Sequence, residues 1–184
     1  MTRRRLQLAA AVVLVFGLAV ASIALASSEN KGHGKHGKNF RAKLIGFNEV
    51  PVTNSNGQGR LRLSQTDTEI TFRLDYSGLS GNPLFAHIHA GQKNVNGGVA
   101  VFFCGGGGKP ACPASTSGSV SGTITAADLV GPAAQGYPAA PAGKLADLEK
   151  AIKAGVAYAN VHTAQFPAGE IRGQIKGGHH GGHR

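Results

Sequence analysis

A histidine pair at positions 87 and 89, together with a third histidine at position 162, is the feature of this sequence best suited to chemistry. Side chains two residues apart in an extended strand share a face, so His87 and His89 should point the same way. If the strand that carries His162 lies beside theirs, three imidazoles meet on one surface. Neutral imidazole binds both copper and zinc, so the arrangement predicts a candidate site for either metal. The alternative is three structural histidines, each hydrogen-bonded to a loop that crosses the sheet.

Two further polar residues could orient these imidazoles. Asn160 lies two residues before His162, so both should lie on the outward face of their strand. Glu170 shares a face with Arg172 and could be a ligand or a partner that orients a ring, although we favour a surface cross-strand ion pair that contributes little. The sequence has no nucleophile elbow, phosphate loop or dinucleotide fingerprint, and we identify no catalytic residue.

The elements that must position these residues follow from the alternation of apolar and polar residues. Such alternation places one face of a strand on a core and the other in water, and clusters of turn residues separate the stretches. We expect an all-β fold, an antiparallel Greek-key-like β-sandwich or barrel. One short crossover helix is expected over 143–154, ended by Gly155. The expected strands are 40–44, 60–63, 70–76, 84–89, 99–103, 118–125, 156–162 and 170–176.

The only two cysteines, Cys104 and Cys112, flank a glycine-rich stretch. An even pair in one short segment of an exported protein predicts a disulfide bond. The alternative, a redox or metal-binding pair of the Cys-x-x-Cys type, requires a shorter spacing than this one.

The first 26 residues have the order of a secretory signal peptide. Arg3, Arg4 and Arg5 precede an apolar stretch from Leu8 to Ala21, and Ala24-Leu25-Ala26 offers a cleavage site. We therefore expect cleavage before Ser27 and a protein that is secreted or held in the cell envelope, with no membrane span after cleavage. An uncleaved membrane anchor is the alternative, and the paired arginines leave the twin-arginine export route open.

Charge and composition limit the partners. The chain carries 19 Lys and Arg against 9 Asp and Glu, but part of this excess lies in the signal segment and in a polar tail. From Phe40 onward the surplus is modest, and aromatic residues make up only 6%, so we do not expect a nucleic-acid binder. Residues 27–39 are rich in Gly, His and Lys, and residues 177–184 are rich in Gly and His. Neither segment has apolar residues to bury, so both are expected to be disordered tails.

Five motifs follow one another along the chain: Gly46-x-Asn48-Glu49-Val50-Pro51, Tyr76-Ser77-Gly78-Leu79-Ser80, His87-Ile88-His89-x-Gly91, Tyr158-x-Asn160-Val161-His162-Thr163 and Pro167-x-Gly169-Glu170-Ile171-Arg172-Gly173-Gln174. In this order they resemble the CHRD domain, named from the secreted protein chordin. The resemblance covers residues 40–176 and implies a β-sandwich domain outside the cytoplasm, without implying a reaction. One departure is Pro51-Val52, where the family often has two prolines.

Two functions fit these observations. The first is a non-catalytic binding or structural module that takes copper or zinc on its histidines and meets an extracellular or envelope protein or ligand. The second is a copper- or zinc-dependent enzyme similar to superoxide dismutase, a Greek-key barrel with a His-x-His pair at its copper site. The sequence has no evident bridging histidine or acidic zinc ligand at suitable spacing, so we favour the first.

Overall fold

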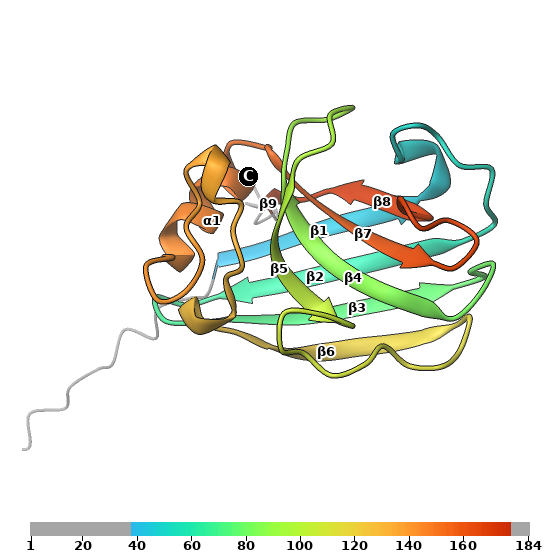
Figure 1. The fold of residues 1–184 in the computed structure, drawn as a ribbon, viewed down its shortest axis with the longest axis horizontal. Helices are drawn as coiled ribbons and strands as arrows, with labels where there is room; N and C mark the ends of the chain where they lie inside the picture. The colour runs from blue at the N-terminus through green and yellow to red at the C-terminus, as the bar shows by residue number, and fades with distance from the viewer. Residues whose placement is uncertain (1–37, 178–184) are drawn as a thin grey trace, which may run out of the picture. The chain divides into compact units, whose positions relative to one another are not determined.

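Nine strands and one α-helix make up residues 38–177, the part of the chain that the computed structural model describes (Figure 1). The predicted signal peptide (1–26) lies outside these residues. So do the predicted tails, except that Lys38 and Asn39 begin the first strand and Gly177 ends the last. The strands are β1 (Lys38–Ile45), β2 (Gln58–Gln65), β3 (Ile70–Ser77), β4 (Pro83–Ala90), β5 (Gly98–Cys104), β6 (Gly118–Ile124), β7 (Ala157–Thr163), β8 (Ile171–Gln174) and β9 (Lys176–Gly177).

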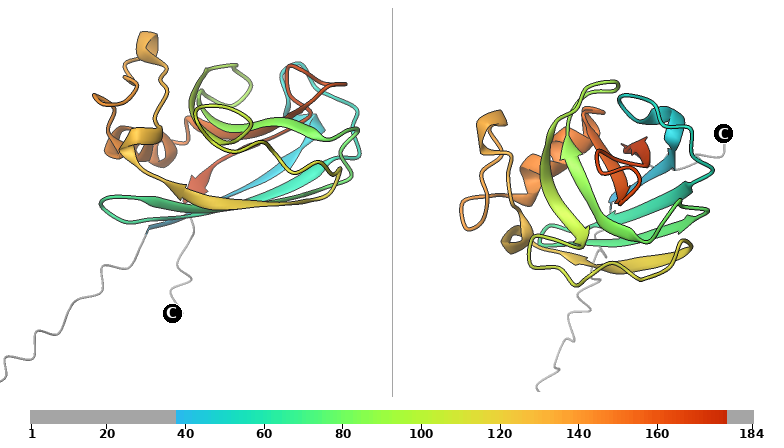
Figure 2. Two further views of the ribbon diagram at one scale, coloured as in Figure 1. Left: turned by 60° about the horizontal axis from the view of Figure 1, so that its bottom comes forward. Right: turned by 45° about the vertical axis from the view of Figure 1, so that its right-hand side comes forward.

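The strands form one antiparallel sheet in the order β5-β4-β7-β8-β1-β2-β3-β6, with β9 pairing to β1. The sheet curls into a nearly closed barrel of two facing layers (Figure 2). Across its interior, Phe72 of β3 and Phe103 of β5 pack with their ring centroids 4.7 Å apart. The predicted all-β, antiparallel sandwich or barrel is confirmed.

The alternation of apolar and polar residues along each strand determines which side chains fill the interior of the barrel. On β1, β2 and β3 the leucines Leu44, Leu61 and Leu74 are fully buried, and the residues next to them point outward. The register pairs Leu61 with Leu74, so like side chains meet on the core face. A one-residue slip would move every leucine into water, and the apolar pattern therefore specifies this register.

The helix α1 (Leu145–Lys153) lies in the crossover between β6 and β7, where a helix was predicted, and covers one end of the barrel (Figures 1 and 2). Leu145, Leu148 and Ile152 are buried against the barrel. Gly155 follows with φ +73°, the left-handed conformation that commonly ends a helix. Three short 3₁₀ turns lie at Gly46–Asn48 (η1), Ala126–Asp128 (η2) and Ala133–Gln135 (η3). Within residues 38–177, no helix is long and apolar enough to cross a membrane.

A disulfide joins Cys104 at the end of β5 to Cys112, as predicted. The segment between them folds back, and the Gly105 amide donates to the Pro110 carbonyl at 2.8 Å. Gly105 has φ +81°, and a Cβ there would lie 2.0 Å from the Leu84 carbonyl oxygen, so only glycine fits this turn. The disulfide therefore fixes a glycine-rich loop at the edge of the sheet.

Candidate metal site

The three histidines converge because their strands are neighbours. His87 and His89 lie on β4, which pairs antiparallel with β7, and this register sets His87 opposite Asn160 and His162 opposite Phe85. Residues that face each other across a strand pair share a face. One nitrogen from each of His87, His89 and His162 lies within 4.8 Å of the others. The ring centroids of His87 and His89, and those of His87 and His162, are 4.5 Å apart.

The cluster lies on the outer face of the barrel, yet it is buried. Ile88 and Val161 point to the interior, as alternation predicts, and the imidazoles point the other way. The expectation that this outer face meets water was wrong, because His87 is only 5% exposed and His89 and His162 are each 8% exposed. Loops cross the face and hydrogen-bond His89 and His162, the contact that the alternative of structural histidines expected for all three rings.

These loop contacts determine where the ring protons lie. Nδ1 of His89 lies 2.8 Å from the Gly97 carbonyl oxygen, and Nδ1 of His162 lies 2.9 Å from that of Pro167. A carbonyl oxygen only accepts, so Nδ1 carries the proton in both rings and Nε2 keeps a lone pair. Nε2 of His162 and Nδ1 of His87 are buried and make no hydrogen bond within residues 38–177. Each of these two rings therefore keeps one buried nitrogen free for a further partner.

Nε2 of His89 has an unusual neighbour. It lies 3.1 Å from Oδ1 of Asn160. A neutral ring with its proton on Nδ1 has only a lone pair at Nε2, and the Asn160 NH₂ group points to Glu49, so this contact brings two acceptor atoms close together. Asn160 therefore contacts the cluster.

Burial keeps all three imidazoles neutral. Burial, with smaller contributions from the nearby His89 and His162, lowers the pKa of His87 to about 2. Burial also lowers the pKa of His89, to about 4, and that of His162, against the effect of their carbonyl partners. The uncharged ring is the form that binds a metal, so the cluster is ready to bind near neutral pH without losing a proton first.

Aromatic and cationic groups hold the cluster in place. The Tyr158 ring stacks on His89 with centroids 4.6 Å apart and an interplanar angle of 4°. The guanidinium of Arg172 lies over the Tyr158 ring, 3.4 Å from the ring centroid. Phe102 packs edge-on against His87, with centroids 5.0 Å apart.

Arg172 also fixes the loop between β4 and β5. Its guanidinium donates to Oδ1 of Asn96 at 3.0 Å and to the carbonyls of Gln92 and Val95 at 3.1 and 2.8 Å. Arg172 is 2% exposed. The predicted surface cross-strand ion pair on this face is therefore wrong. Both side chains are buried, and each is bonded to other groups.

Glu170 is the centre of a separate hydrogen-bond network. Oε1 accepts from the Ser55 hydroxyl at 2.6 Å and from the Ser80 amide at 2.7 Å. Oε2 accepts from the hydroxyls of Thr163 at 2.6 Å and Ser80 at 2.7 Å. Burial raises the pKa of Glu170, but these hydrogen bonds lower it by more, so the carboxylate stays ionised. Glu170 thus binds hydroxyl and amide groups of the loops that flank His162, and it hydrogen-bonds none of the three imidazoles.

Glu49, just after the 3₁₀ turn η1, was missed by the sequence analysis. It is 5% exposed, and burial raises its pKa to about 7, against the opposing effects of the Arg172 charge and of hydrogen bonds from the Val50 backbone and from Asn160. Its Oε1 makes no hydrogen bond within the described residues. Gly169 leaves room for it, since a Cβ there would lie 2.5 Å from Oε1. Glu49 belongs to a motif of the family resemblance, which was the one sequence signal for it.

The domain is an antiparallel β-barrel that carries three buried histidines on its outer face. The family model of the CHRD domain matches residues 40–175, so the chain belongs to the CHRD family. Searches of curated proteins and of solved structures found no match.

Proposed function

We propose that this CHRD domain is a non-catalytic module that binds one copper or zinc ion through His87, His89 and His162. The convergence of one ring nitrogen from each of the three imidazoles within 4.8 Å carries the proposal. A tetrahedral ion with Zn–N bonds of about 2.0–2.1 Å needs its ligand nitrogens roughly 3.4 Å apart, so small side-chain rotations close the site. The Nδ1 contacts to Gly97 and Pro167 are the kind that fix ligand histidines in a single tautomer.

Metal titration tests this proposal. The full chain, freed of metal with a chelator, should bind one zinc or copper ion per molecule. Replacing His87, His89 and His162 by Gln should lower the affinity at least about 100-fold, because three direct ligands are lost and loss of a supporting residue alone costs about 10–100-fold.

The five remaining histidines lie in the terminal segments and supply the matched control, because such tracts can also chelate ions. They are His33, His36, His179, His180 and His183. Replacing all five by Gln should leave the tight site intact. If the tight site disappears with these five and survives in the cluster variant, the proposal is wrong.

A dismutase-like enzyme is the alternative use of the same residues. The described part of the chain places no carboxylate among the ligand atoms of the cluster, and Phe102 packs against His87. We therefore favour binding over catalysis. The copper-loaded proteins of the titration decide between them, since superoxide removal that depends on the cluster would replace a binding role with an enzymatic one.

We also propose that the protein acts outside the cytoplasm. The Cys104–Cys112 disulfide supports this location, because such bonds persist in oxidising compartments. The charged, apolar and small-residue order of residues 1–26 supports it independently. N-terminal sequencing of protein recovered from the medium or the envelope should start at Ser27, and an intact Met1 on that material would contradict cleavage.

A further inference from the structure

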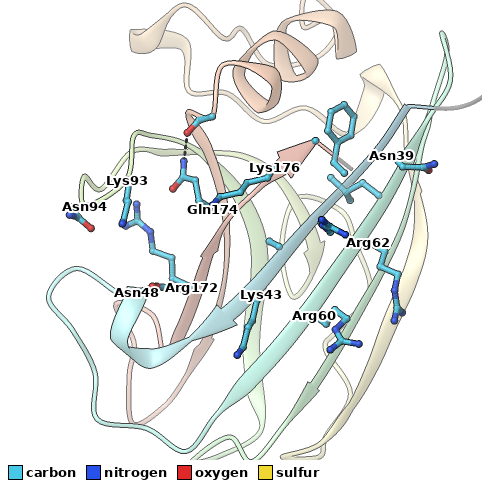
Figure 3. Close-up of a pocket in the computed structure, with 16 residues that line it drawn as sticks. Asn39, Lys43, Asn48, Arg60, Arg62, Lys93, Asn94, Arg172, Gln174 and Lys176 are labelled. Carbon is cyan, nitrogen blue, oxygen red and sulfur yellow. Dashed lines mark hydrogen bonds between the residues drawn. The ribbon is translucent and has the colours of Figure 1, made fainter. Parts of the chain in front are cut away.

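A groove of about 1190 Å³ runs over the outer face of β1, β2, β8 and β9 (Figure 3). Lys43 extends from β1, and Arg60 and Arg62 extend from β2, along one side of it. Lys93 and Asn94 of the loop between β4 and β5 border the other side. Seven cationic residues and no carboxylate line the groove. Its cations are Arg41, Lys43, Arg60, Arg62, Lys93, Arg172 and Lys176.

The strand register arranges these cations in rows. Arg41 of β1 pairs with Lys176 of β9 on one side and with Arg62 of β2 on the other. Arg62 in turn pairs with Arg73 of β3, so four cations on adjacent strands form one row. Two residues along the strands, Lys43 pairs with Arg60 in a second row. Neighbouring strands lie about 4.8 Å apart, so the charges repeat at short intervals across the face.

Like charges opposite each other destabilise a sheet, so this arrangement works against the fold. Asp75, which lies opposite Arg60, offsets only part of this repulsion. Its carboxylate lies 3.2 Å from the guanidinium of Arg62 and 2.8 Å from that of Arg73. Arg41, Lys43, Arg60 and Lys176 are exposed and make no ion pair within residues 38–177. The modest surplus of basic residues in the domain is therefore concentrated on one face.

We propose that this groove binds an acidic polysaccharide, an extended sugar polymer that carries carboxylate or sulfate groups. The rows of cations match a chain with regularly spaced anions. Asn39, Asn48, Asn94 and Gln174 also line the groove and supply amide groups that can hydrogen-bond sugar hydroxyls. The aromatic residue of the lining, Phe40, is buried, so the groove has no exposed ring on which a nucleic-acid base could stack. This site is separate from the histidine cluster and does not depend on a metal.

The test measures binding of the full chain to polygalacturonate and to heparin, with neutral dextran as a control. We expect the protein to bind both acidic polymers, or one of them if the groove prefers carboxylate or sulfate. The affinity should fall as the salt concentration increases. The triple variant Arg41→Gln, Lys43→Gln, Arg60→Gln should bind at least about 10-fold more weakly. It should also fold, because it removes like-charge repulsion on an exposed face, and thermal unfolding checks this.

A matched control removes three cations elsewhere, on and beside α1: Lys144→Gln, Lys150→Gln, Lys153→Gln. It lowers the net charge by the same amount and should keep wild-type affinity. Equal weakening by the two triple variants would mean that binding reflects total charge, and it would overturn the proposal. So would failure to bind either acidic polymer, or a stronger groove-dependent affinity for a DNA oligonucleotide or for phosphatidylglycerol vesicles than for both polymers.

Discussion

Metal-free protein should lose stability steeply as the pH falls from 7 to 4. The unfolded chain takes up protons on its imidazoles near pH 6.5, whereas burial holds the folded pKa of His87 near 2 and that of His89 near 4, and lowers that of His162. Their contribution to stability is therefore complete above pH 6.5 and is lost as the pH falls toward the folded values. Each imidazole contributes up to about 1.4 kcal/mol per pH unit.

Glu49 acts in the opposite sense. Its folded pKa of about 7 lies above the ordinary value of 4.5, so the folded state takes up a proton first and gains stability as the pH falls from 7 to 4.5. One carboxyl offsets only part of the effect of three imidazoles, and the net change remains a loss.

Urea unfolding at four pH values between 7 and 4, in the presence of a chelator, measures this balance. The Gln variant of the three histidines should show a much flatter dependence than the wild type. Glu49→Gln should show a steeper one, because the folded state then gains no compensating proton. Identical pH dependence in the wild type and the three-histidine variant would contradict the assignment of the effect to the cluster.

Replacing Glu170 by Ala should cost about 4 kcal/mol or more in the free energy of unfolding. The substitution deprives four hydrogen bonds of their acceptor, and the donors, on Ser55, Ser80 and Thr163, lie in a part-buried or buried network that water does not fully replace. Glu170→Gln keeps the shape and one acceptor oxygen, but it places an NH₂ group against donors. Its cost should be smaller, roughly 2 kcal/mol.

Urea unfolding at pH 7 measures both variants. Glu69→Ala is the control, because Glu69 lies in the turn between β2 and β3 and the bonds it accepts from Thr66 use its backbone carbonyl. That variant should remain within about 0.5 kcal/mol of the wild type. A loss below about 1 kcal/mol in Glu170→Ala would show that the network contributes little to stability.

The strands and the positions of the histidines could be predicted because alternation is a local property of the sequence. The same pattern places Ile88 inward and His87 outward, whatever the rest of the chain does. The disulfide could also be predicted, because both cysteines lie in one short segment.

What lies over the histidines could not be predicted in this way. The carbonyls of Gly97 and Pro167 reach the rings from loops whose paths depend on tertiary contacts, such as the bond from Asn96 Nδ2 to the Val50 carbonyl. Arg172 illustrates the error that results. Alternation placed it correctly on the outer face, but its three loop partners and the Tyr158 ring turn that face into an interior.

The close packing behind Gly97 limits how this domain can vary in evolution. A Cβ at position 97 would lie 1.7 Å from the Ala90 carbonyl oxygen, so no other amino acid fits while the hairpin of β4 and β5 keeps its path. The same residue supplies the carbonyl that orients His89. A descendant of this sequence could therefore exchange many exposed residues freely, yet any substitution at position 97 would move the backbone and release His89 from its partner. Keeping the histidine cluster therefore also requires glycine at position 97, although this residue has no side chain to contribute to the cluster.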